Sequence, residues 1–283
     1  MAVKALVEII RPLNSVMSGF AVIVALSMVT GGDFLSILPV PVIVFGFLTG
    51  FFVTASSMVF NDYFDKDIDL INEPNRPIPR GDISATTALA YGIILGLIGI
   101  FFASLINLYC LLVALIGWFI SILYNGWGKK TGLPGNMMVS FCVTIPFIFA
   151  QAMLREFNPI TIIFIMIVFF ANTGREIIKG IADVAGDLAR GVRTIAVVYG
   201  EKTAAKVASL FYLIAVALTP IPVILNFVNL FYIVLILIVD VGFVLSSIII
   251  VRNPKRSIAL REKKRAILLM LLGLIAFMVG TIR

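Results

Sequence analysis

Residues 38–81 read LPVPVIVFGFLTGFFVTASSMVFNDYFDKDIDLINEPNRPIPRG. The first half, up to residue 60, is a predominantly apolar run that is long enough to cross the hydrocarbon core of a bilayer. The second half, from Asn61 to Gly81, carries four aspartates directly beside the predicted membrane surface. Acidic side chains at that depth are costly without a partner. This stretch therefore predicts a membrane span that ends in a functional site.

Comparable apolar runs recur along the whole chain. Hydrophobic residues make up 61% of its 283 residues and charged residues 13%. We predict nine spans, at residues 12–30, 38–60, 84–105, 107–125, 136–153, 159–178, 204–225, 229–251 and 265–282. Gly, Pro and Asn mark the turns between them. The sequence thus predicts one all-α membrane domain, residues 1–283, with nine transmembrane helices around a central cavity and the polar site at its cytoplasmic edge.

The positions of Lys and Arg orient this bundle. With nine spans, all but Arg155 and Arg283 lie on the face that holds the N-terminus. The positive-inside rule makes that face of the cell membrane cytoplasmic. The net charge of +7 then reflects topology and attraction to anionic membrane lipids, and it does not indicate a nucleic-acid partner. The seven bases from Arg252 to Arg265 are expected to serve this role in a loop, without paired acids.

Missing and buried residue types narrow the chemistry. The chain has no His, which excludes His-based nucleophilic triads, the usual zinc sites and haem ligation by His. Cys110 and Cys142 each lie inside an apolar run, where they are expected to be packing residues. Catalysis must therefore depend on carboxylates, amides, bases and hydroxyls.

Two acidic patterns lie on the predicted cytoplasmic face. Asp62, Asp65 and Asp69 share one side of a helix that continues past the membrane edge, whereas Asp67 points elsewhere. After the sixth span, a single helix side would carry Glu176, Lys179, Asp183 and Asp187. Carboxylates gathered in this way need cations, and Mg²⁺ commonly bridges carboxylates to phosphate oxygens. The pattern predicts Mg²⁺ on a diphosphate, with Asp62, Asp65, Asp69, Asp183 and Asp187 as catalytic metal ligands.

Bases near these acids are candidates for binding the rest of the diphosphate charge. They are Arg76, Arg80, Lys129, Lys130, Arg190 and Arg193. Asn14 lies one turn into an apolar span and needs a polar partner, so it is expected to face the site beside Arg11; simple anchoring is the alternative for Arg11. Gly92, Gly96 and Gly99 have the spacing for close helix packing, with a tunnel lining as the alternative.

These residues resemble a known family. Asn61, Asp62, Asp65 and Asp69 match the NDxxDxxxD signature of UbiA-type intramembrane prenyltransferases, and Asp183 with Asp187 matches their DxxxD signature. The resemblance covers the whole chain, including the NRPIPRG that follows the first signature. It is strongest to the archaeal ether-lipid branch, through RPLNSVMSGFAV, GLPGN and REIIKGIADVAGD. The sequence departs from that branch at Gly180, Ala182 and Ala185, where acids are usual.

The resemblance implies an activity. It implies Mg²⁺-dependent transfer of a geranylgeranyl group from geranylgeranyl diphosphate to the hydroxyl of geranylgeranylglyceryl phosphate, within the membrane. Family members carry a diphosphate-binding Lys soon after a Tyr at the end of span 4; here Tyr124 precedes Lys129 and Lys130, and either could serve. The expected substrate-binding residues are Arg11, Asn14, Asn61, Arg76, Arg80, Tyr124, Lys129, Lys130, Lys179 and Arg193.

Three alternatives remain open at this point. A UbiA-type enzyme could use an aromatic quinone precursor as its acceptor. A secondary transporter would place charges near mid-membrane, and only Asp240 in span 8 suits that idea. A CDP-alcohol phosphotransferase would need a DGxxAR arrangement, which the sequence lacks. Sequence alone leaves the prenyl length, the proton acceptor and the oligomeric state undetermined.

Overall fold

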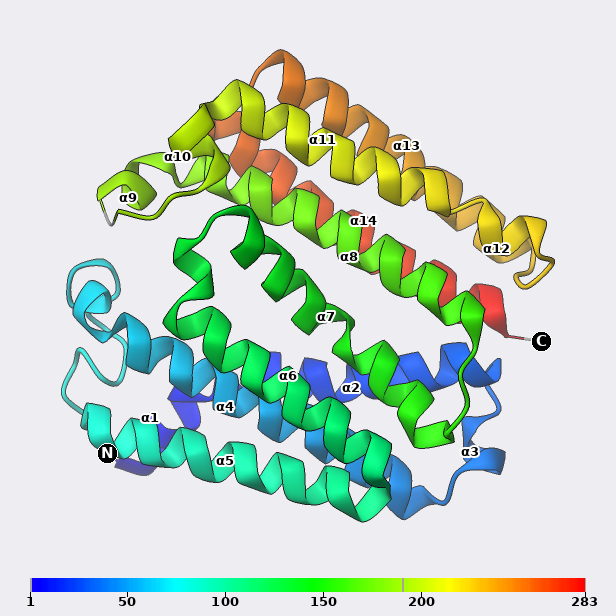
Figure 1. Cartoon of the computed structure of the whole chain (residues 1–283), viewed down its shortest axis with the longest axis horizontal. Helices are drawn as coiled ribbons and strands as arrows, with labels where there is room; N and C mark the ends of the chain where they lie inside the picture. Colours follow the sequence, from blue (N-terminus) through cyan, green and yellow to red (C-terminus); the bar gives the residue numbers. More distant parts are fainter. Residues whose placement is uncertain (1, 190, 283) are drawn as a thin grey trace. The chain divides into compact units, whose positions relative to one another are not determined.

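The structure is a computed structural model that describes residues 2–189 and 191–282, and these residues form helices and turns without a strand. Nine of the described helices are long and apolar enough to cross a membrane (Figure 1). They are α2 (Pro12–Thr30), α4 (Val40–Asn72), α5 (Ala85–Ile106), α6 (Leu108–Gly126), α7 (Leu133–Leu154), α8 (Pro159–Ala182), α11 (Glu201–Leu218, continued by α12, Ile221–Ile224), α13 (Leu230–Arg252) and α14 (Arg256–Thr281). The predicted all-α membrane fold with nine spans is confirmed.

The chain divides into two compact units, which are described separately. Unit 1 contains Met1–Leu26, Phe34–Gly126 and Ile145–Phe157, and unit 2 contains Ser27–Asp33, Trp127–Thr144 and Asn158–Arg283. The helix α7 contributes residues to both. The prediction of a single domain with a central cavity stays a prediction.

Small residues bring the helices of unit 1 together. A Cβ atom on Gly99 of α5 would lie 2.9 Å from the Val53 side chain of α4, and one on Gly92 would lie 3.2 Å from Val59. A Cβ atom on Gly96 would overlap the ring of Trp118 on α6. The glycine spacing therefore serves close helix packing, as predicted.

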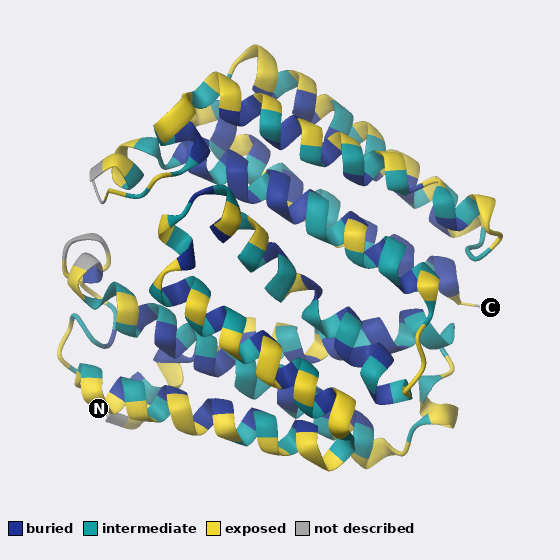
Figure 2. Ribbon diagram, in the orientation of Figure 1, coloured by how far each residue is buried: buried dark blue, intermediate teal, exposed yellow. Residues whose placement is uncertain are grey.

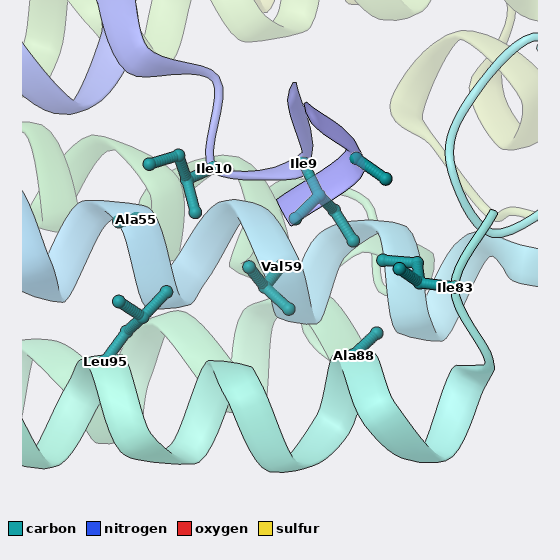
Figure 3. Close-up of a cluster of buried hydrophobic side chains, with 8 residues drawn as sticks. Ile9, Ile10, Ala55, Val59, Ile83, Ala88 and Leu95 are labelled. Atoms are coloured by element: carbon teal, nitrogen blue, oxygen red, sulfur yellow. The ribbon is translucent and has the colours of Figure 1, made fainter. Parts of the chain in front are cut away.

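A short helix precedes the first span and was not predicted from the sequence. The helix α1 (Ala2–Ile9) presents Ala5 and Ile9 to α4 and α5. Figure 3 shows this cluster of buried side chains, which contains Ala5, Ile9, Ile10, Ala55, Val59, Ile83, Ala88 and Leu95. Burial of this apolar face fixes the N-terminal segment against the helix that carries the first acidic pattern.

Unit 2 is built on α8, which packs against α11 and α14. Figure 2 shows the buried faces of these helices in dark blue. Tyr212 of α11 is fully buried, and Gly174 of α8 leaves room for its ring, because a Cβ atom there would lie 2.7 Å from it. Aromatic rings pack near the start of α8, where the ring centroids of Phe164 and Phe277 of α14 lie 4.6 Å apart.

The basic segment after α13 differs from the prediction. The helix α14 begins at Arg256 rather than at residue 265, so most of the expected loop is helical. Its one acid, Glu262, is fully buried, and its carboxylate accepts from Arg265 at 3.0 Å and from the Ser246 hydroxyl at 2.7 Å. Arg261 pairs with the same carboxylate at 3.3 Å. The expectation that these bases lack paired acids was wrong, because helix periodicity places Arg265 one turn from Glu262.

Candidate active site

The first acidic pattern lies on one continuous helix. α4 runs from Val40 to Asn72, so it continues well past the predicted span at residues 38–60. Asp62 and Asp69 are 2% and 5% exposed, whereas Asp67 is exposed. The helix therefore turns Asp62 and Asp69 inward and Asp67 outward, as the 3.6-residue period requires.

Two guanidinium groups neutralise these buried carboxylates. Arg11 Nη2 donates to Asp62 Oδ1 at 2.6 Å. Arg76 Nη1 donates to the same oxygen at 3.2 Å and to Asp69 Oδ2 at 2.6 Å. Because buried carboxylates are costly unless they are paired, the two arginines make this cluster possible.

Arg11 reaches the cluster from a strained turn. It lies two residues after the end of α1 and has φ = 46°, in the left-handed region that non-glycine residues rarely adopt. Pro12 fixes the start of α2 at the next position. The strain is held by the packing of α1 and by the Asp62 ion pair. The sequence placed Arg11 at the site, and the structure puts it against the first acidic pattern.

Asn61 connects the cluster to a neighbouring helix. Its Oδ1 accepts from Arg11 Nη2 at 3.2 Å, and its Nδ2 donates to Asp65 Oδ2 at 3.2 Å and to Asn125 Oδ1 at 3.1 Å. Asn125 is buried on α6 and donates to the Ser57 carbonyl at 3.2 Å. The sequence analysis did not select Asn125, although a polar residue directly after Tyr124 at the end of an apolar span was a usable signal.

Two predicted binding residues have other contacts. Arg80 pairs with Glu8 at 2.9 Å and with Asp82 at 2.6 Å, which ties the loop after α4 to α1. Hydrogen bonds to these acids raise the pKa of Arg80 above its ordinary value. Asn14 is exposed and donates to Met58 Sδ at 3.9 Å rather than to an acid of the cluster. Their roles in substrate binding remain predictions.

Burial and the neighbouring Arg76 guanidinium set the electrostatics of Asp69, which lies beyond the predicted span at residues 38–60. Burial raises the pKa of Asp69 above its ordinary value of 3.8, and the nearby Arg76 guanidinium opposes that rise. Desolvation disfavours the charged carboxylate, whereas the ion pair favours it. The positive charge beside the Asp69 carboxylate, here the Arg76 guanidinium, therefore determines how readily Asp69 keeps its negative charge.

The second acidic pattern is interrupted, contrary to the prediction of one continuous helix side. α8 ends at Ala182, Asp183 caps it, and Asp187 lies on the short helix α9 (Val184–Ala189). Backbone hydrogen bonds join the segments, from the Asp183 N–H to the Lys179 carbonyl at 3.1 Å and from the Asp187 N–H to the Asp183 carbonyl at 2.9 Å. Asp183 and Asp187 are both partly exposed.

Glu176 does not join Asp183 and Asp187. It accepts from Arg175 at 2.5 Å and from Lys179 at 3.3 Å, and it is buried. Lys179 therefore has an internal partner one turn away on the same helix. The expected stripe is divided into an ion-paired group at Glu176 and a carboxylate pair at the end of α8.

Loop geometry places the backbone of Arg193 against that of Lys130, two of the predicted bases of unit 2. Lys129 and Lys130 lie in the short 3₁₀ helix η1 (Gly128–Lys130), and the Lys130 carbonyl accepts from the Arg193 N–H at 3.3 Å. Gly132 permits this approach, because it has φ = 73° and a Cβ atom there would overlap the Arg193 carbonyl. Arg190, which the sequence also suggested, lies outside the described residues.

These geometries bear on metal binding. Within the described residues, no three Asp, Glu or Cys side chains are gathered closely enough to hold a metal ion together. Mg²⁺ is usually held by only one or two carboxylates together with substrate phosphates and water. The oxygens of the first pattern are hard donors of that kind, so the residues present fit a magnesium ion that is completed by substrate.

Comparisons with known proteins agree with this description. The sequence profile of the UbiA prenyltransferase family matches residues 18–272. A digeranylgeranylglyceryl phosphate synthase from Archaeoglobus fulgidus is 35% identical over 98% of this chain and 95% of its own length.

Solved structures are similar as well. The structure described as "Structural and mechanistic insights into the biosynthesis of Digeranylgeranylglyceryl phosphate synthase in membranes" has a TM-score of 0.88 and 29% identity, covering 99% of both chains. A UbiA homolog from Archaeoglobus fulgidus bound to DMAPP and Mg²⁺ has a TM-score of 0.69 over 96% of this chain and 98% of its own, and at 19% identity it shows the fold alone.

Proposed function

Because this chain belongs to the UbiA prenyltransferase family, we propose that it transfers a geranylgeranyl group from geranylgeranyl diphosphate to the hydroxyl of geranylgeranylglyceryl phosphate. The products are a digeranylgeranylglyceryl phosphate, which contains the second ether bond of an archaeal membrane lipid, and diphosphate. The observation that carries the proposal is the near full-length similarity to a synthase of that name. The buried acid and arginine cluster supplies chemistry that suits a diphosphate.

The first motif is proposed to bind the diphosphate together with Mg²⁺. Asp62, Asp65 and Asp69 offer oxygen ligands of the kind that Mg²⁺ prefers, and Asp183 with Asp187 offer a second pair. The ion supplies stabilisation of negative charge on the leaving diphosphate when it is bound. The support for this proposal is the presence of these five carboxylates in the two motifs of the chain.

Bases of the chain complete the charge balance. Arg11 and Arg76 each present a planar fork that can bind phosphate oxygens in two places, and Lys129, Lys130 and Arg193 add positive charge in unit 2. As the allylic C–O bond breaks, its electron pair leaves with the diphosphate. The acceptor oxygen then forms the new C–O bond and loses its proton, to water or to a carboxylate such as Asp69.

The membrane setting suits these substrates. The chain is a multi-pass membrane protein, and both prenyl chains are lipid-soluble. We place the N-terminus and the acidic motifs on the cytoplasmic side, because nearly all Lys and Arg would lie on that face. Charged head groups would then stay at the membrane edge while the prenyl chains remain among apolar helices.

An assay with purified protein tests the activity. Radiolabelled geranylgeranyl diphosphate and Mg²⁺ would be offered with geranylgeranylglyceryl phosphate and, separately, with aromatic acids. We expect a labelled diether phospholipid only with the first acceptor and no product in EDTA. Transfer only to an aromatic acid would replace the lipid assignment with the quinone-type alternative, and full activity in EDTA would exclude the magnesium proposal.

A further inference from the structure

A base from the C-terminal part of the chain reaches the second acidic motif. Arg256, the first residue of α14, donates from Nε to the Ala182 carbonyl at 3.1 Å, across 74 positions of sequence. Ala182 is buried and is the last residue of α8, directly before Asp183. For this base the sequence suggested membrane orientation and attraction to anionic lipids, with binding of the acceptor's phosphate as the alternative.

The C-terminal end of α8 is stabilised by a positively charged partner. The last carbonyls of a helix have no intrahelical donor and carry a partial negative charge. Asp183 and Asp187 add two carboxylates within five residues of Ala182. A guanidinium bonded to the Ala182 carbonyl both supplies the missing donor and offsets this negative charge.

Arg256 is held in place by its own helix. Glu262 lies nearly two turns further along α14, is fully buried, and is hydrogen-bonded to Ser246 of α13 and to Arg265. This buried network fixes the start of α14 against α13. Because α14 also packs along α8, the Arg256 side chain leaves from a well-defined place beside the end of α8.

The same end of α8 is supported by a second segment. A Cβ atom on Gly180 would lie 3.6 Å from the Thr194 side chain. Thr194 begins the short helix α10 (Ile195–Tyr199) and accepts from the Val197 N–H at 3.3 Å. Its neighbour Arg193 is bonded to the Lys130 carbonyl. Arg256 and the Arg193–Thr194 segment thus hold the turn of α8 that leads into Asp183.

We propose that Arg256 is a positioning residue for the second aspartate motif. By fixing the Ala182 carbonyl, it determines where Asp183 leaves α8 and how its carboxylate is presented. The consequence for Mg²⁺ rests on the proposed function, since it requires Asp183 to be a metal ligand. Removal of the guanidinium loosens the α8–α9 junction and weakens metal use, without changing how the acceptor binds.

The test compares Arg256→Gln, Arg256→Lys and a control, Arg252→Gln, in the full-length protein in detergent. Arg252 lies in the last turn of α13 and is exposed, so its variant removes the same charge from the same connection. Hydrogen exchange of the Asp183 and Asp187 amides is expected to speed up about tenfold in Arg256→Gln. The Mg²⁺ concentration for half-maximal transfer should rise about fivefold, with the acceptor KM within twofold of wild type. Arg256→Lys should recover most of both effects, and Arg252→Gln should match wild type.

Several outcomes would overturn the proposal. Unchanged exchange with a raised acceptor KM would make Arg256 a ligand for the acceptor phosphate instead. Faster exchange throughout α8, α11 and α14 would mean general destabilisation. If the wild-type protein transferred no prenyl group to any acceptor, the proposed function would fail, but the exchange data would still test the positioning role separately.

Discussion

At the scale of single residues, Arg76 controls the charge of the first motif. It lies between Asp62 and Asp69, bonded to both carboxylates and only partly exposed. A divalent cation that binds these carboxylate oxygens must either displace the guanidinium or share the oxygens with it. Arg76 is thus both a competitor for the metal and, once released, a candidate partner for the diphosphate.

This competition predicts an unusual effect of Arg76→Gln. Mn²⁺ binding, measured by electron paramagnetic resonance without prenyl diphosphate, should tighten about 5- to 10-fold, which corresponds to about 1 kcal/mol. Prenyl transfer should nevertheless fall, because a base for the diphosphate is lost. The control is Lys66→Gln on the same helix, where the ammonium lies 5.1 Å from the Tyr63 ring centroid. Weaker Mn²⁺ binding in Arg76→Gln would contradict this competition and would show that Arg76 instead helps to position the metal ligands.

The aspartates themselves give a second prediction. Asp65→Ala and Asp183→Ala should each lower turnover at least about 100-fold, the scale of losing one electrostatic stabiliser of a transition state. Protein yield and helical circular dichroism should stay at wild-type values. Asp67→Ala is the matched control, because Asp67 is exposed on the same helix and should keep near wild-type activity. Wild-type turnover in either of the first two variants would contradict the two-motif proposal.

At the scale of helices, α5 depends on its glycines. Gly96 faces the Trp118 ring, and Trp118 in turn donates to the Ser56 hydroxyl at 2.8 Å. That hydroxyl donates to the Gly92 carbonyl at 2.6 Å. Three helices, α4, α5 and α6, are therefore joined by one indole and one hydroxyl at a point where no larger residue fits.

Gly96→Ala is accordingly expected to destabilise the protein by about 1–3 kcal/mol, as for an overpacked interior. The measurement is thermal unfolding in detergent, followed by circular dichroism. Gly273→Ala in α14 is the matched control, because a Cβ atom there would lie 3.8 Å from the nearest Val239 atom. That variant should be neutral or slightly stabilising, since Ala favours helix over Gly. Equal unfolding midpoints for the two variants would contradict the close packing at Trp118.

At the scale of the whole molecule, the odd number of spans predicts that the two termini lie on opposite faces of the membrane. The basic residues predict that the N-terminus is cytoplasmic. A fluorescent protein fused before Met1 should therefore be fluorescent in cells, and alkaline phosphatase fused after the last residue should be active outside. A non-fluorescent N-terminal fusion together with an inactive C-terminal phosphatase would reverse the orientation and move both acidic motifs to the outer face.

Much of this organisation could be predicted from the sequence. The nine spans could be predicted because a span depends on the local content of apolar residues. The outward position of Asp67 could be predicted from the period of the helix. The break at Asp183 and the helical start of α14 could not, because helix ends depend on tertiary partners such as Arg256 for the Ala182 carbonyl.

The sequence by itself determined the fold class, the membrane spans and the two aspartate motifs, since each depends on residues that are close along the chain. Only the tertiary structure decided which charges meet. Arg11 reaches Asp62 across 51 positions and Asn61 reaches Asn125 across 64. Such contacts arise when helices pack, and packing depends on the shapes of distant side chains that no local pattern encodes.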